Sequence, residues 1–164
     1  TLIDEAPELL SGNPSYDSRA NFMLTATMGL NGFISMGVDE DWATHMIGHE
    51  LTALCGLDHG ETLAIVHPGV MDIMRKEKRG KLLQYARRVW NITIENEEQA
   101  IDEAIERTEN FFRSIGKKTR LSEYGIGDDV IETIVERFKQ RGWNVGEYGI
   151  VTPEKTRLIL ERVK

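Results

Sequence analysis

Histidines are the residues of this chain whose type and spacing are best suited to chemistry. All four lie between His45 and His67, and His45 and His49 are four residues apart. On a helix, that spacing places two imidazoles on one face, about 6 Å apart. His59 follows a break at Gly56, so a helix-turn-helix can bring it back to face the pair. Imidazole suits zinc and ferrous iron, and two or three such ligands leave a position open for substrate.

The residues around the histidine pair bear on whether the rings point inward. A His pair at this spacing also occurs on solvated helix surfaces. Here the pair is flanked by small or apolar residues, which favours inward rings that need a partner: Ala43, Met46, Ile47 and Leu51. His67 precedes Pro68, and we interpret it as a turn or pocket-wall residue rather than a metal ligand.

Three other groups near the histidines are not assigned to chemistry. The stretch from His49 to Ala53 begins like the His-Glu-x-x-His signature of zinc proteases, but Ala53 stands where the second ligand is needed. Cys55 is interpreted as a core-packing residue rather than a nucleophile. Asp41 lies in the first turn of the expected helix, where the helix dipole explains an aspartate without a metal.

Composition excludes several classes of protein. The 164 residues are 40% hydrophobic and 29% charged, a normal balance for a globular chain. A net charge of −7 argues against nucleic-acid binding. We interpret the one basic stretch, residues 75–88, as the solvent-exposed face of a helix. A single cysteine fits a reducing cytoplasm. No apolar run approaches the ~18 residues that a membrane span requires.

Hydrophobic spacing favours helices along nearly the whole chain. Residues 17–36 are small and apolar on all sides, which predicts a buried helix, and 40–56 form the histidine helix. Further helices are expected at 59–75 (with a kink or a new start at Pro68), 77–90, 97–115, 128–141 and from 152 onward. We therefore expect an all-α multi-helix bundle that forms a single domain over residues 1–164. No phosphate-binding glycine loop is present, so most nucleotide-binding machinery would lie elsewhere.

The histidine pattern, His45-x3-His49-x9-His59-Gly60 running on to Pro68, resembles the signature of iron-containing alcohol dehydrogenases. The stretches DWATH (41–45), LDH (57–59), LLQYA (82–86) and VWNIT (89–93) are similar to those of the broad-specificity aldehyde reductases and butanol dehydrogenases of that family. The similarity extends over essentially the whole chain.

The resemblance implies specific roles for the histidines. In that family, an N-terminal α/β domain binds NAD(P), and a C-terminal helical domain carries most of a metal site made of one Asp and three His. His45 and His59 correspond to the last two metal ligands. His49 corresponds to a histidine near the nicotinamide, proposed to relay a proton. The family's other ligands form an Asp-x-x-x-His pair upstream, and no histidine precedes His45 here, so we expect half a metal site and no nucleotide-binding domain.

The implied activity is reversible hydride transfer between an aldehyde and a primary alcohol, with Fe²⁺ or Zn²⁺ and NAD(P), NADP being the expected form, in a homodimer. With two imidazoles, the 164 residues alone would bind metal weakly and lack dehydrogenase activity. A second hypothesis is a free-standing helical metal-binding module that takes further ligands from Asp58, Glu50 or a symmetry partner. A third hypothesis is a purely structural helical bundle whose histidines are packed but bind no metal.

Overall fold

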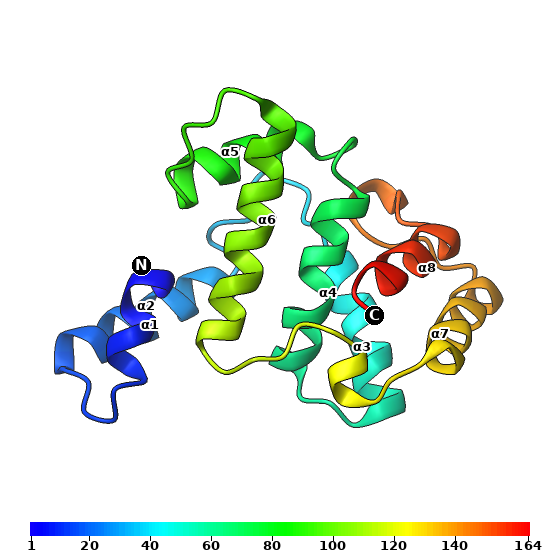
Figure 1. The fold of residues 1–164 in the computed structure, drawn as a ribbon, viewed down its shortest axis with the longest axis horizontal. Coiled ribbons are helices and arrows are strands. Elements are labelled where there is room, and N and C mark those ends of the chain that lie inside the picture. The colour runs from blue at the N-terminus through cyan, green and yellow to red at the C-terminus, as the bar shows by residue number, and fades with distance from the viewer. The chain divides into compact units, whose positions relative to one another are not determined.

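The computed structural model describes all residues, 1–164, and consists of helices joined by turns and loops (Figure 1). The only β-type pairing is one isolated bridge between Val145 and Val151, which confirms the expected all-α class. The α-helices are α1 (Leu2–Leu9), α2 (Tyr16–Leu30), α3 (Ala43–Cys55), α4 (His59–Ile73), α5 (Arg79–Val89), α6 (Glu97–Ser114), α7 (Asp128–Arg141) and α8 (Pro153–Arg162). Residues 1–40 and 41–164 form two compact units.

The first unit is a pair of helices, α1 and α2, that pack on each other. Ser15 caps α2 by accepting a hydrogen bond from the Ser18 N–H at 3.1 Å. The expectation that residues 17–36 form a buried helix is wrong on two counts. The helix ends at Leu30, and Ser18 is its only buried residue. Two short helices present too little surface to enclose apolar side chains, so several stay exposed: Phe22, Met23, Leu24 and Leu30.

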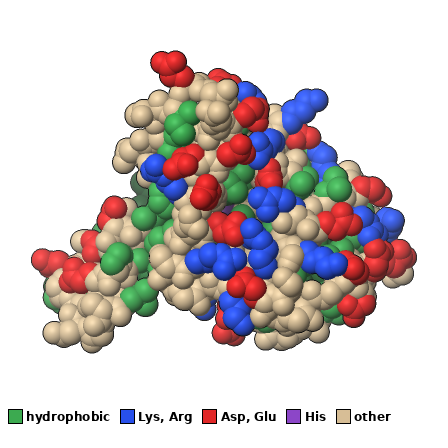
Figure 2. Space-filling model, viewed as in Figure 1, with side chains coloured by type: hydrophobic (Ala, Val, Ile, Leu, Met, Phe, Trp, Pro, Cys, Tyr) green, Lys and Arg blue, Asp and Glu red, His purple; other side chains and the backbone are tan.

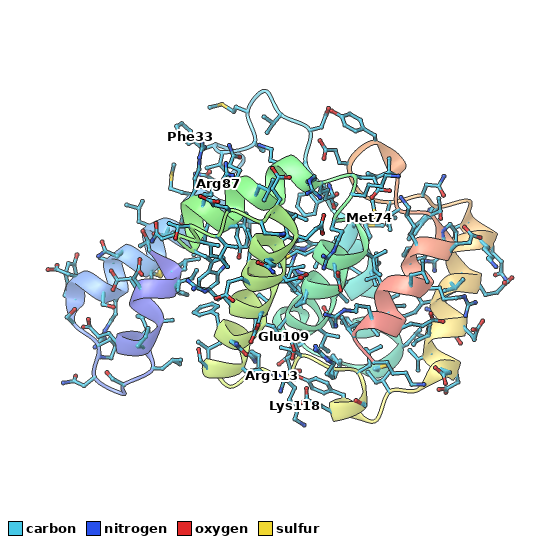
Figure 3. All side chains as sticks on the ribbon, turned by 45° about the horizontal axis from the view of Figure 1, so that its top comes forward. Phe33, Met74, Arg87, Glu109, Arg113 and Lys118 are labelled. Atoms are coloured by element: carbon cyan, nitrogen blue, oxygen red, sulfur yellow. The ribbon has the colours of Figure 1, made fainter.

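The second unit is built around α4, which packs against α3, α6 and α8 (Figure 1). Its largest cluster of buried side chains comes mainly from α3, α4, α7 and α8, and includes Ile47, Leu51, Ile65, Val66, Phe138 and Leu160. Met74, which caps the C-terminal end of α4, is also fully buried in it (Figure 3). Burying each such side chain contributes about 1.5–3 kcal/mol. The helix that begins with His59 is therefore the best-anchored element of the unit.

Helix α4 runs through Pro68 without the break that the sequence suggested. A proline inside a helix removes one backbone hydrogen bond. The helix tolerates this loss because the residues around Pro68 are buried against the rest of the unit. At the next position, a Cβ on Gly69 would lie 2.8 Å from the backbone oxygen of Ile159, so α8 packs directly on the α4 backbone. Burial by neighbouring helices keeps α4 continuous.

Helices α5 and α6 form a flank joined to α4 by apolar and ionic contacts. Ile101 and Ile105 on α6 pack with Met71 and Leu82. The basic stretch over 75–88 is not a free cationic patch, because Arg75 binds Glu98 at 3.1 Å and other acidic side chains nearby. Figure 2 shows Lys and Arg interleaved with Asp and Glu over the visible face of residues 41–164. No helix is long and apolar enough to cross a membrane.

Candidate metal centre

Helix α3 carries two of the candidate ligands, and both of its ends are defined. At its start, Asp41 Oδ1 accepts a hydrogen bond from the Ala43 N–H at 2.8 Å. At its end, Gly56 adopts φ 69°, the left-handed conformation that glycine accommodates without strain. The chain then reverses, and α4 begins at His59. The predicted helix-turn-helix is therefore confirmed, and it returns His59 toward α3.

The rings of His45, His49 and His59 converge on one region. Their centroids are separated by 5.0 Å between His45 and His59, 5.2 Å between His49 and His59, and 6.3 Å between His45 and His49. One ring nitrogen from each histidine lies within 4.8 Å of the other two. His45 is half-buried, whereas His49 and His59 are exposed. The sequence predicted that His59 would face the pair formed by His45 and His49, and these distances confirm it.

This arrangement fits a transition-metal cation. Zinc takes imidazole nitrogens at about 2.0–2.1 Å in tetrahedral geometry, which corresponds to nitrogens about 3.4 Å apart. The three ring nitrogens are within 4.8 Å of one another, so small side-chain rotations complete the approach. Imidazole also suits ferrous iron. His45 and His59 can therefore hold a divalent metal, and His49 lies beside the same point.

The surroundings of His45 favour its metal-binding form. Burial, together with the nearby His59 and His49, lowers the pKa of His45 below its ordinary value. Only the neutral imidazole binds a metal. The ring of Trp42 lies 4.9 Å from that of His45, centroid to centroid, and forms one wall beside it.

The other acidic candidates are engaged elsewhere. Glu50 is buried and accepts hydrogen bonds from Arg137, at 2.8 Å, and from Arg141. Burial alone would raise the pKa of Glu50, but these two arginines outweigh that effect and hold it below its usual range. Asp41 Oδ2 lies 2.6 Å from Lys78 Nζ, which accounts for an aspartate here without a metal. Asp58 is not part of the converging set.

The structure also shows the surroundings of Cys55 and His67. Cys55 packs against the main core, and burial raises the pKa of its thiol, so it is a packing residue. His67 is a pocket-wall residue, as predicted, but it lies inside α4 rather than in a turn. It helps to line a cavity of 410 Å³ together with His45, Leu63 and Phe112, and Thr44 Oγ1 lies 3.5 Å from its Nδ1.

Comparisons with known proteins identify the family of this chain. A family model described as "Fe-containing alcohol dehydrogenase family, C-terminal" matches residues 1–162. The NADPH-dependent aldehyde reductase YqhD of Escherichia coli is 47% identical over 100% of this chain and 43% of its own length. NADH-dependent butanol dehydrogenase A of Clostridium acetobutylicum is 33% identical over 94% of this chain and 40% of its own length.

Solved structures show the same relationship. A crystal structure of Escherichia coli YqhD matches with a TM-score of 0.95 and 47% identity, over 99% of this chain and 42% of that one. That of an NADH-dependent butanol dehydrogenase A from Thermotoga maritima matches with a TM-score of 0.89 and 28% identity, over 99% and 43%. The chain thus spans about two fifths of the length of the relatives it matches. It belongs to the iron-containing alcohol dehydrogenase family, and it corresponds to the C-terminal part of that family's proteins.

Proposed function

We propose that residues 1–164 act as the helical metal-binding domain of an NAD(P)-linked alcohol dehydrogenase that interconverts aldehydes and primary alcohols. The observation that carries the proposal is the 5.0 Å separation of the rings of His45 and His59, the two residues to which the sequence resemblance assigns metal binding. The names of the relatives, an aldehyde reductase and a butanol dehydrogenase, support this substrate class.

We assign metal binding to two of the histidines and proton transfer to the third. His45 and His59 hold the metal, Zn²⁺ or Fe²⁺, together with an Asp and a His from another part of the protein. When bound, the cation supplies Lewis-acid chemistry at the carbonyl oxygen, and the nicotinamide supplies the hydride. His49 carries the proton to or from the substrate oxygen, since its exposed imidazole lies beside the same point.

We also propose, from the family, a nucleotide-binding domain, a cofactor and an oligomeric state for the enzyme. A nucleotide-binding domain outside these residues would bind NAD(P). NADP is the expected form, because the relative with 47% identity is NADPH-dependent. We further propose a cytoplasmic homodimer.

The test is an assay of the longer protein that contains both this chain and a nucleotide-binding part. With butanal, the wild type should oxidise NADPH, and His45→Ala and His59→Ala should lose both the bound metal and the activity. His49→Ala should keep the metal but lower kcat by roughly 10²–10⁴, the range for a general acid or base. His67→Gln is the matched control and should retain metal and most activity.

Two results would refute the proposal. One is full activity in the His45→Ala and His59→Ala variants. The other is robust NADPH oxidation by the 164 residues alone, because these lack a phosphate-binding glycine loop.

A further inference from the structure

We propose that a cavity between α4 and α5 is a binding site for a medium-chain aliphatic carboxylate, with the alkyl chain against its apolar wall and the carboxylate at Lys81 and Arg88. The cavity has a volume of 430 Å³ and is lined entirely by residues of the second unit, 41–164. It is not the metal centre, because none of His45, His49 and His59 lines it. The proposal involves neither a metal nor a nicotinamide, so it can fail independently of the proposed function.

The wall of the cavity suits an alkyl chain. Its volume falls within the range of about 300–1,000 Å³ that small-molecule sites occupy. Helix α4 contributes Val70 and Met71 to the wall, and α5 contributes Leu82 and Tyr85. The Tyr85 hydroxyl lies 2.8 Å from Thr108 Oγ1 on α6, so this polar group is already hydrogen-bonded and needs no partner from a ligand. An aliphatic chain would remove this apolar surface from water.

Two cations that line the cavity have no carboxylate partner. Lys81 and Arg88 lie seven residues apart on α5, on the same face of the helix, and neither forms an ion pair. Lys78, the third cation of the lining, is neutralised, because its Nζ lies 2.6 Å from Asp41 Oδ2 and 3.2 Å from Glu147 Oε2. Charge complementarity therefore favours an anionic group beside Lys81 and Arg88.

Gln84, which also lines the cavity, lies between these two cations. Lys81 Nζ donates to Gln84 Oε1 at 3.3 Å, and turning the amide over places its oxygen 3.1 Å from Arg88 Nη1. A neutral amide keeps both side chains near one point without cancelling their charge. The two oxygens of a carboxylate can accept from both cations at once, in hydrogen bonds of the strong, charge-assisted kind. The three side chains therefore form a carboxylate-binding group on one face of α5.

Simpler ligands would use only part of the cavity. Inorganic phosphate or a very short carboxylate could bind the two cations, but it would leave the apolar wall exposed to water. A neutral alcohol could cover the wall, but it would leave the charges of Lys81 and Arg88 without a counterpart. An alkyl chain that ends in a carboxylate matches both the wall and the cations.

The experiment is a calorimetric titration of the 164-residue chain with octanoate, butanoate and 1-octanol. Octanoate should bind one-to-one and roughly tenfold or more tightly than butanoate, because each additional buried CH₂ strengthens binding about fourfold. Lys81→Gln and Arg88→Gln should each weaken octanoate binding about threefold, the scale of a single exposed ion pair, and leave 1-octanol binding unchanged. Arg87→Gln is the matched control, because it removes the same charge from α5 (Figure 3) at a residue that does not line the cavity. Far-UV circular dichroism checks that each variant is folded.

Methyl NMR locates the ligand without any variant. In protein labelled with ¹³C at the methionine methyl groups, octanoate should shift the resonance of Met71, which lines the cavity. The resonance of Met46, which packs against the main core, should stay unchanged. The longer protein that contains this chain should show the same shift of Met71.

Three results would overturn the proposal. Equal affinity for octanoate and 1-octanol would show that the cations do not take part in binding. Unchanged octanoate affinity in both Lys81→Gln and Arg88→Gln would place the carboxylate elsewhere. A Met71 shift in the 164 residues that is absent from the longer protein would show that another part of that protein covers the cavity. None of these results depends on NADPH oxidation, so the dehydrogenase proposal is tested separately.

Discussion

Gly48 on α3 lies so close to Thr62 on α4 that a Cβ at residue 48 would be 2.7 Å from Thr62 Oγ1. Thr62 is fully buried, and its hydroxyl donates to the backbone oxygen of His59 at 2.9 Å. The threonine therefore cannot rotate away without losing that bond. This contact sets how closely α3 approaches α4, and with it the distance from His45 and His49 to His59.

Gly48→Ala should therefore destabilise the protein and weaken metal binding. Alanine is the better helix former by about 1 kcal/mol, but forcing a methyl group into this contact costs roughly 1–3 kcal/mol. Urea unfolding and Zn²⁺ titration would measure the two effects. Gly80→Ala on α5 is the matched control, since a Cβ there meets nothing within 4 Å, and it should be neutral or stabilising. Equal stability of the two variants would show that α3 and α4 can accommodate a methyl group at residue 48 and would contradict this prediction.

A double variant locates the cause of that destabilisation. Thr62→Ala removes the Oγ1 atom that a Cβ at residue 48 would meet. The combined change should therefore cost less than the sum of the two single changes, by more than 0.5 kcal/mol, the usual sign of directly interacting sites.

Glu50 should be a structural residue with no part in metal binding. Its carboxylate joins α3 to Arg137 and Arg141 on α7. Glu50→Ala should lower the free energy of unfolding by about 1.5–3 kcal/mol, the range for hydrogen bonds to charged groups. The effect stays moderate because both arginines remain partly exposed to water. Glu132→Ala, which breaks the exposed pair with Arg157, should cost at most about 1 kcal/mol. A tenfold loss of Zn²⁺ affinity in Glu50→Gln would contradict the assignment.

His67 should make stability dependent on pH. Burial lowers the pKa of His67 below its ordinary value, an effect that Asp41 partly offsets. The unfolded chain therefore takes up a proton near pH 6.5 that the folded chain does not yet accept. Stability should be full above about pH 6.5 and fall as the pH drops toward the folded pKa, by at most about 1.4 kcal/mol per pH unit.

The variant His67→Leu tests this dependence, because leucine does not titrate. Urea unfolding at several values between pH 5 and pH 8 should show a shallower slope for His67→Leu than for the wild type. Identical slopes would mean that His67 is not the group responsible.

The sequence carried enough information for the fold class and for the approach of His45 to His59. Helical spacing predicted the elements, and the glycine at 56 indicated where α3 would end. Burial of α2 was mispredicted because periodicity describes one helix and not the surface its neighbours offer. The helix-turn-helix also predicted that His59 would face both His45 and His49, and the 5.2 Å between the rings of His49 and His59 agrees with it. A turn at His67 was one of its two interpretations because Pro68 was expected to kink the helix or to begin a new one, whereas packing keeps α4 continuous.

The most direct test of the metal centre is anomalous diffraction from crystals of this protein soaked in Zn²⁺, recorded at the zinc edge. We predict one strong peak between the rings of His45 and His59, within about 2.0–2.1 Å of a nitrogen of each. A peak elsewhere on the molecule, with those two rings unliganded, would contradict the account.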